Sequence, residues 1–159
     1  MQKRPAIWDA FSRLRGKSGW GLVRSHGSMF FLEMGDPLLR TGEANPHGEW
    51  HFLFELCHWR FETANEVLVG SEDDQQFIDT EFERLSLGSV ESAEVSTPSH
   101  DLIIKFSSGV RFRTFSTSAE ATSQWTQWLL YGPPEEDYAW VSDGGGNIRC
   151  ITGDEPVRA

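Results

Sequence analysis

The sequence contains only two cysteines, Cys57 and Cys150, in 159 residues. They stand in unlike surroundings and form no C-x-x-C motif, so neither a disulfide framework nor a zinc ribbon is indicated. We expect both thiols to be reduced, and a hydrophobic core rather than covalent cross-links to stabilise the fold.

Long hydrophobic runs are also missing from the chain. No stretch of about 18 uncharged apolar residues occurs in it. The first residues, MQKRPAIWDAF, lack an apolar stretch of the length found in signal peptides. These two absences predict a soluble, cytoplasmic protein that does not insert into a membrane.

Positive charge is scarce, because 14 lysines and arginines stand against 24 aspartates and glutamates, a formal net charge of −10 at pH 7. Such a charge repels the phosphates of nucleic acids and of anionic membranes, so we expect neither as a partner. It favours association with a basic protein partner. The last quarter of the chain is acidic and ends in a predicted hairpin or tail over residues 144–159.

Aromatic residues are plentiful by contrast, with 7 tryptophans and 11 phenylalanines. They supply enough apolar surface for one domain over residues 1–159. Ile7, Phe11 and Leu14 share one face of a helix, which predicts a helix over residues 5–15. Core positions are the expectation for several tryptophans, namely Trp8, Trp50, Trp125 and Trp140.

A second helical stripe lies 71 positions further along the chain. Ile78, Phe82 and Leu85 repeat the spacing of the first stripe. Ser71 and Asp74 predict a capping box at the start of this second helix. Each helix precedes several segments with strand character, which indicates an internal duplication.

The duplication predicts two pseudo-repeats, residues 5–71 and 76–143, each with one helix and an antiparallel meander. The predicted fold class is therefore α+β, a tandem helix plus antiparallel β-meander repeat packed as one domain. The helices would cover sheet faces that are otherwise apolar and exposed. A β-sandwich or a partly closed barrel with two helices is the alternative.

Several strands and turns are visible in the second half of the chain. Leu102, Ile104 and Phe106 alternate with Lys105, as on a strand with one buried face. FSSGVRF predicts a hairpin with Gly109 at a position of positive φ, and VSDGGGNIRCI predicts another. The proline-containing tracts GDPLLRTGEANPHG and YGPPEED are predicted loops.

The stretch GEWHFLFELCHWRFE, residues 48–62, places polar groups inside an apolar run. On one continuous strand, alternate residues share a face. One face then turns polar after Leu56, just as the other turns aromatic at Trp59 and Phe61. This pattern predicts a long strand that leaves one packing layer and enters another through a bulge.

His51, Glu55 and Cys57 of this stretch project to the same side, and imidazole, carboxylate and thiolate all ligate zinc. An extended strand separates His51 from Glu55 by about 13 Å, so one ion needs a bulge or ligands from elsewhere. His26 or His47 is a candidate to complete such a site. The candidate ligand or metal cluster is His26, Glu33, His51, Glu55 and Cys57.

A structural role is the alternative for these side chains. Glu55 would then pair with an arginine such as Arg24 or Arg60, and Cys57 would pack as a small hydrophobic residue. Cys57 and His58 point to opposite faces of a strand, which excludes them as a nucleophile and base pair. A nucleophile and base pair of Cys57 with His51 or His26 is an alternative. We predict no catalytic residue, no cofactor and no resident metal.

Four phrases, HGSMFFLEMGD, GEWHFLFELCHWRFE, VLVGSEDD and DLIIKFSSGVRFRTF, resemble a pattern found in small uncharacterised bacterial proteins, some of them similar to immunity proteins. The resemblance covers most of residues 16–130. It implies a binding role and carries over no active-site residue.

Three functional hypotheses follow from the sequence. The first is a non-enzymatic, cytoplasmic protein-binding module, immunity-like, whose acidic surface binds a basic protein partner. The alternative is a small-molecule or metal-binding domain, including a hydrolase, that uses the His, Glu and Cys residues of 48–62. The third is a homodimer formed through an exposed sheet edge.

Overall fold

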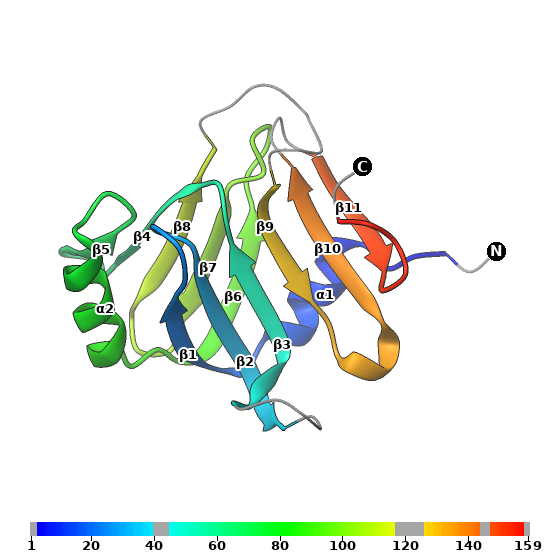
Figure 1. Cartoon of the computed structure of the whole chain (residues 1–159), viewed down its shortest axis with the longest axis horizontal. Coiled ribbons are helices and arrows are strands. Elements are labelled where there is room, and N and C mark those ends of the chain that lie inside the picture. The colour runs from blue at the N-terminus through cyan, green and yellow to red at the C-terminus, as the bar shows by residue number, and fades with distance from the viewer. Residues whose placement is uncertain (1–2, 40–44, 117–125, 144–146, 158–159) are drawn as a thin grey trace.

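The computed structural model describes residues 3–39, 45–116, 126–143 and 147–157 (Figure 1). It contains two α-helices, α1 (Ile7–Leu14) and α2 (Gln75–Arg84), and one short 3-10 helix, η1 (Pro134–Glu136). The remaining elements are strands: β1 (Ser18–Arg24), β2 (Phe30–Leu38), β3 (His47–Phe54), β4 (His58–Glu62), β5 (Val67–Gly70), β6 (Gly88–Val95), β7 (Leu102–Phe106), β8 (Arg111–Phe115), β9 (Thr126–Tyr131), β10 (Tyr138–Asp143) and β11 (Asn147–Thr152).

The strands form one open antiparallel sheet of 11 strands in the order β11-β10-β9-β3-β2-β1-β6-β7-β8-β4-β5. Only two residue pairs, Ser18 with Ser89 and Gly19 with Gly88, join β1 to β6 at the centre. This narrow junction divides the sheet into a first half, β11 to β1, and a second half, β6 to β5. The predicted α+β class with antiparallel meanders and two helices is confirmed at this level.

The strand order has an internal symmetry. Each strand from β1 to β5 has a counterpart five strands later, β6 to β10. When every strand between β10 and β5 is replaced by its counterpart, the resulting strand order is the original order read backwards. The meander β1-β2-β3 lies beside β9 and β10, and the meander β6-β7-β8 lies beside β4 and β5. Such an order is expected if two helix-plus-meander units exchange their last two strands, and the duplication itself stays a prediction.

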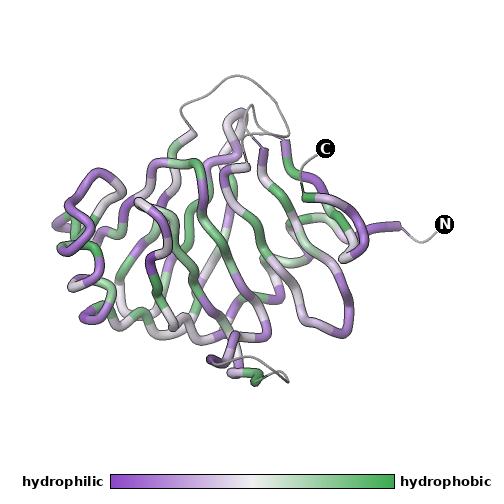
Figure 2. Tube along the Cα trace, viewed as in Figure 1, coloured by the Kyte–Doolittle hydropathy of each residue, from purple (hydrophilic) through white to green (hydrophobic). Residues whose placement is uncertain are grey.

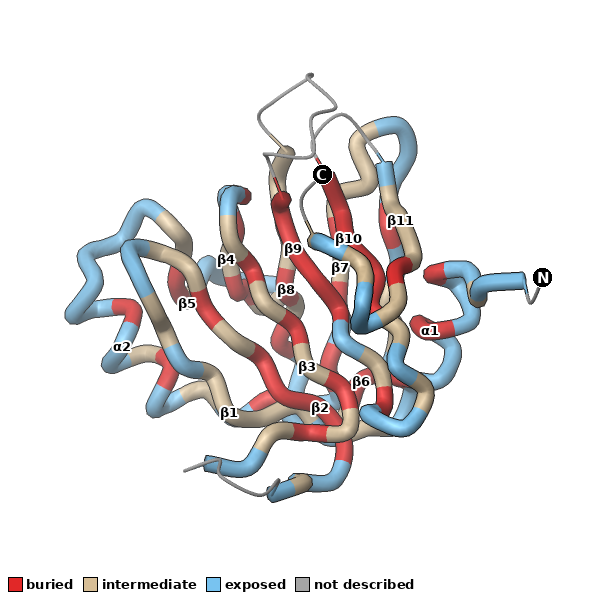
Figure 3. Tube along the Cα trace, turned by 45° about the vertical axis from the view of Figure 1, so that its right-hand side comes forward, coloured by how far each residue is buried: buried red, intermediate tan, exposed pale blue. Residues whose placement is uncertain are grey.

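The hydrophobic core lies between the inner faces of the two halves. Phe54 of the first half packs 4.6 Å from Phe112 of the second, and Phe30 lies 5.6 Å from Phe112, measured between ring centroids. α1 contributes Phe11, which packs against Trp128, and α2 contributes Phe82, which packs 5.1 Å from Phe30. Figure 3 shows both helices with buried residues on one side and exposed residues on the other.

The predicted helices and hairpins are present. α1 and α2 lie within the helical stripes, and β7 with β8 and β10 with β11 pair as antiparallel hairpins. Gly109 has the expected positive φ of 92° in the β7–β8 turn. Along β7, Leu102, Ile104 and Phe106 are buried and Lys105 is exposed, as the alternation predicts.

The prediction of one continuous strand over residues 48–62 is wrong. β3 ends at Phe54, and the backbone N–H groups of Glu55 and Leu56 donate to carbonyls of β9. The chain then crosses to the second half of the sheet, where β4 pairs with β8 and β5. The change of packing layer is therefore real, and a break between two strands produces it.

Three smaller predictions are also wrong. No side chain caps the start of α2; the Ser71 hydroxyl instead accepts a hydrogen bond from the Trp59 N–H at 3.1 Å. Trp8 is 54% exposed because it lies on the outer side of α1, and Trp125 lies outside the described residues. The predicted loop GDPLLRTGEANPHG is shorter than expected, because β2 continues to Leu38.

Candidate functional site

A carboxylate, two imidazoles and a backbone amide converge on the outer face of the β2–β3 hairpin. Phe30, Leu32 and Met34 of β2 point into the core, so Glu33 points to the opposite face, directly across from His51 of β3. The pairing register shifts between Met34 and Pro37, which is the irregularity that a bulge produces.

Two histidines four residues apart meet beside this register shift. An ideal strand would separate the Cα atoms of such residues by about 13 Å, but the ring centroids of His47 and His51 lie 4.8 Å apart. Gly48 sits between them, so close to β2 that a Cβ there would lie 2.5 Å from the Met34 carbonyl oxygen. The hairpin bends at a residue that has to be glycine.

The side chain of Glu33 forms hydrogen bonds with both imidazoles and with the backbone amide. Nδ1 of His51 lies 2.6 Å and Nδ1 of His47 2.9 Å from the same oxygen, Oε1. The Gly48 N–H donates to Oε2 at 2.9 Å. A carboxylate can only accept, so both imidazoles donate from Nδ1. The carboxylate is therefore held by three donors, and only 6% of its side chain is exposed.

The electrostatics of Glu33 follow from this arrangement. Burial raises the pKa of Glu33, but the hydrogen bonds from His51, His47 and Gly48 outweigh burial, so the pKa lies below its usual value. The site therefore holds a charged carboxylate beside two ring nitrogens at neutral pH.

The imidazoles border a shallow cavity of about 300 Å³. The His51 ring stacks on Phe31 at 5.1 Å between centroids and lies 5.7 Å from the Tyr131 ring of β9. His47 is more open, with 45% of its side chain exposed against 16% for His51. The cavity is lined by Phe31, His47, Gly48, Glu49, His51, Leu53, Tyr131 and Gly132.

The structure places the predicted cluster residues in different surroundings. Glu33 and His51 meet, and His47 joins them as the third group. His26 lies in the turn between β1 and β2, where its carbonyl accepts from the Met29 N–H. Cys57 is 8% exposed in the core, and burial, with smaller contributions from nearby Asp101 and Glu55, raises its pKa to about 12.

Glu55 lies in the link between β3 and β4, and its negative charge contributes, after burial, to the raised pKa of Tyr131. Within the described ranges, one group of three potential metal ligands converges, and it consists of Glu33, His47 and His51, with ligand atoms that all lie within 4.8 Å of one another.

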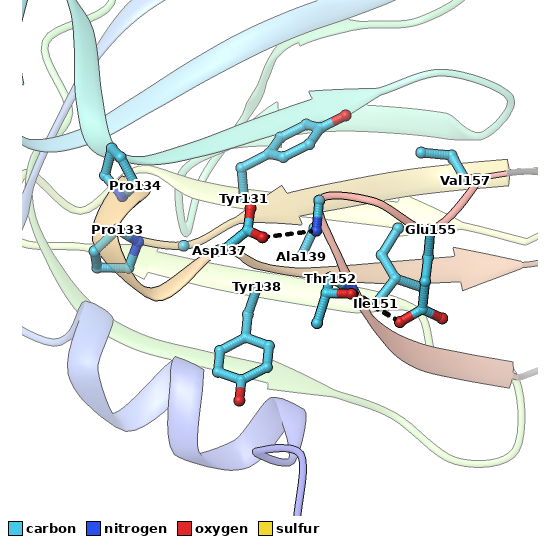
Figure 4. A pocket seen from close by; sticks show the side chains of 12 residues that line it. Tyr131, Pro133, Pro134, Asp137, Tyr138, Ala139, Ile151, Thr152, Glu155 and Val157 are labelled. Carbon is cyan, nitrogen blue, oxygen red and sulfur yellow. Dashed lines mark hydrogen bonds between the residues drawn. The ribbon is translucent and has the colours of Figure 1, made fainter. Parts of the chain in front are cut away.

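A second cavity of about 310 Å³ lies at the β9–β10 connection and the end of β11 (Figure 4). Its carboxylates already have partners, because Asp137 accepts from the Gly153 N–H at 3.2 Å and Glu155 accepts from the Thr152 hydroxyl at 3.0 Å. Tyr131 and Tyr138 point to opposite sides of it (Figure 4). These contacts order the C-terminal turn, and we assign this cavity no chemistry.

No protein-family model, curated protein or solved structure is detectably similar to this chain. In the described residues, no helix has the length and apolar character that crossing a membrane requires.

Proposed function

We propose that Glu33, His47 and His51 bind a divalent transition metal, with zinc as the metal that fits their chemistry best. The observation that carries this proposal is the convergence of two imidazole nitrogens on one carboxylate oxygen, at 2.6 and 2.9 Å. Two histidines and one carboxylate are a ligand set found in zinc sites that keep an open coordination position.

Only a small adjustment of the side chains is needed for a metal to enter. Ligands of a tetrahedral zinc lie about 2.1 Å from the metal and hence about 3.4 Å from one another. The nitrogens of His47 and His51 would move away from Glu33 Oε1 by less than about 1 Å. Each imidazole would ligate through Nδ1 and carry its proton on Nε2. Zinc affinity should rise with pH, because a doubly protonated imidazole cannot ligate a metal.

The cavity beside the ligands suggests what such a metal would do. An open coordination position toward Phe31, Leu53 and Tyr131 would hold a water molecule or a small ligand. A zinc-bound water is acidic enough to serve as a nucleophile near neutral pH. The small-molecule-binding and hydrolase hypothesis therefore belongs to this site and shares its test.

Isothermal titration of the full chain with zinc chloride, after treatment with a chelator, tests the proposal. We expect one zinc per chain, and a loss of at least about tenfold in affinity for Glu33→Gln and for His51→Ala. His58→Ala is the matched control, because His58 Nδ1 also faces a carboxylate, Glu72, at 3.0 Å on the surface. Equal affinity in wild type and Glu33→Gln would overturn the proposal.

A second candidate function is the immunity-like binding of a basic protein partner. The observation that favours it is the exposed surface of α2 and the turn before it, where Phe77 is 45% exposed among acidic side chains. Figure 2 shows hydrophilic residues along this end of the molecule. The acidic residues exposed there are Glu72, Asp73, Asp74, Asp79 and Glu83.

Capture from the native host tests the binding candidate. The full chain should recover one basic protein repeatedly, and a Phe77→Ala variant should recover less of it, because Phe77 offers the largest apolar contact of this surface. Thr80→Ala, on an exposed position of the same helix, is the control. Repeated recovery of no basic protein would count against this candidate.

A further inference from the structure

Positive charge gathers on the outer face of β4, β7 and β8, in a chain whose formal net charge is −10. Arg60 of β4 lies directly across from Arg113 of β8, and Lys105 of β7 lies directly across from Arg111 of β8. Like charges at opposite positions of neighbouring strands destabilise a sheet. The fold therefore retains two unfavourable cation pairs side by side.

A single carboxylate offsets this charge. Glu62, with 10% of its side chain exposed, lies 2.5 Å from Nε of Arg113, 3.1 Å from Nε of Arg60 and 4.0 Å from Nε of Arg111. Burial raises the pKa of Glu62, but the hydrogen bonds and charges of Arg113 and Arg60 outweigh burial. The pKa therefore lies below its usual value, and Glu62 is ionised at neutral pH. The four cations and Glu62 leave a formal charge of +3.

Four arginines elsewhere in the described chain each form an ion pair with a single carboxylate, which sets this face apart. These ion pairs are Arg4 with Glu155, Arg13 with Glu136, Arg24 with Asp79 and Arg149 with Asp143. Three guanidinium groups that share Glu62 thus keep donors for a further anion.

The guanidinium groups are also held in place. The Arg60 guanidinium carbon lies 4.7 Å from the centre of the Phe115 ring, and Arg111 Nη2 donates to the Thr63 carbonyl at 3.2 Å. The arginine side chains remain 31 to 38% exposed. An ordered guanidinium loses little conformational freedom when it binds a carboxylate through two parallel hydrogen bonds.

We propose that this face, formed by Arg60, Lys105, Arg111 and Arg113 around Glu62, docks an acidic segment of a partner protein. Neighbouring strands lie about 4.8 Å apart, so the cations form a compact patch that a few successive carboxylates can cover. A long polyanion such as a nucleic acid would extend beyond the patch and meet the acidic remainder of the chain. The face shares no residue with the proposed metal site.

A labelled hexaglutamate peptide is the probe that tests this proposal, with binding to the full chain measured by fluorescence anisotropy. We expect binding at about 20 mM salt that weakens about tenfold at about 200 mM. The double variant Lys105→Gln, Arg111→Gln should bind at least about tenfold more weakly than wild type. Neither substitution removes the closest partners of Glu62, which are Arg60 and Arg113.

Arg84→Gln is the matched control, because Arg84 is an exposed arginine of α2 whose ion pair with Glu81 is at the surface. It should bind hexaglutamate as wild type does, and all variants should keep the wild-type circular dichroism spectrum. Equal binding by the double variant and wild type would overturn the proposal. Tighter binding of a six-nucleotide DNA strand than of hexaglutamate would also overturn it, in favour of a nucleic-acid surface.

Discussion

Two buried carboxylates, Glu33 and Glu62, lie on the outer faces of the two halves of the sheet, each held by nitrogen donors. Glu33 lies in β2 with His47 and His51, and Glu62 lies in β4 with arginines from β4 and β8. Imidazoles can lose a proton and ligate a metal, whereas guanidinium groups stay charged. A buried glutamate thus supports a proposed metal-binding site in one half of the sheet, and another buried glutamate supports a permanently charged surface in the other half.

Both halves of the sheet should fold as one unit around a shared core, and a substitution of Phe112 should have the largest effect on stability. Phe112 contacts Phe30 and Phe54 across the two halves, so Phe112→Ala should lower the free energy of unfolding by about 4 kcal/mol. Urea unfolding followed by tryptophan fluorescence and by circular dichroism measures it. Phe115→Ala, on the outer face of the same strand, should cost much less, and two separate transitions would contradict the single unit.

The two carboxylates should differ in their importance for stability. Glu62→Gln leaves three arginines without their shared anion and should cost about 3 kcal/mol. Glu33→Gln should cost about 1 kcal/mol, because the glutamine amide oxygen still accepts a hydrogen bond. Urea denaturation at pH 7 checks the order, and an equal or larger loss for Glu33→Gln would contradict the comparison.

Acid should remove the contribution of Glu33. Its pKa is lower in the folded protein than in the unfolded chain, so its stabilisation is present above about pH 4.3 and is lost as the pH falls through the folded value. The difference in the free energy of unfolding between wild type and Glu33→Gln should therefore shrink by about 1 kcal/mol as the pH falls from neutral to below the pKa of Glu33 in the folded protein. Denaturation of both proteins over this range measures the difference, and a constant difference would contradict the lowered pKa.

The smallest expected effect concerns the thiol of Cys57. Cys57 is buried in the core with a pKa of about 12, so the native protein should show almost no reaction of Cys57 with a thiol reagent near pH 8. Cys150 is half-buried on β11 and should react first. Mass spectrometry of the labelled peptides distinguishes the two, and rapid labelling of Cys57 in the folded chain would show that it is accessible.

The sequence predicted the features that depend on local periodicity. An apolar stripe along α1 and along α2 marks the side of each helix that faces the core. The alternation along β7 marks the buried face of that strand in the same way. The errors at Trp8 and at Ser71 arise because a helix position or a cap motif does not reveal which tertiary contacts are made. The break after Phe54 depends on pairing with β9, a strand more than seventy residues away in the chain.

The candidate site was predictable only in part for the same reason. Glu33 and His51 were singled out from the sequence, and the structure brings these two together. The sequence offered His47 only as an alternative to His26, and it did not place His47 against Glu33. That contact lies beside the register shift between Met34 and Pro37, which no spacing rule for a regular strand contains. The spacing of His47 and His51, four residues apart with Gly48 between them, does not by itself predict this contact.

The most direct test of the metal-binding claim is an anomalous difference map, recorded at the zinc absorption edge from crystals grown with zinc. We expect one strong peak about 2.1 Å from Nδ1 of His47, from Nδ1 of His51 and from a carboxylate oxygen of Glu33. Crystals of Glu33→Gln grown in the same zinc concentration should lack this peak. A map with Glu33 still hydrogen-bonded to both histidines and no peak between them would contradict the account.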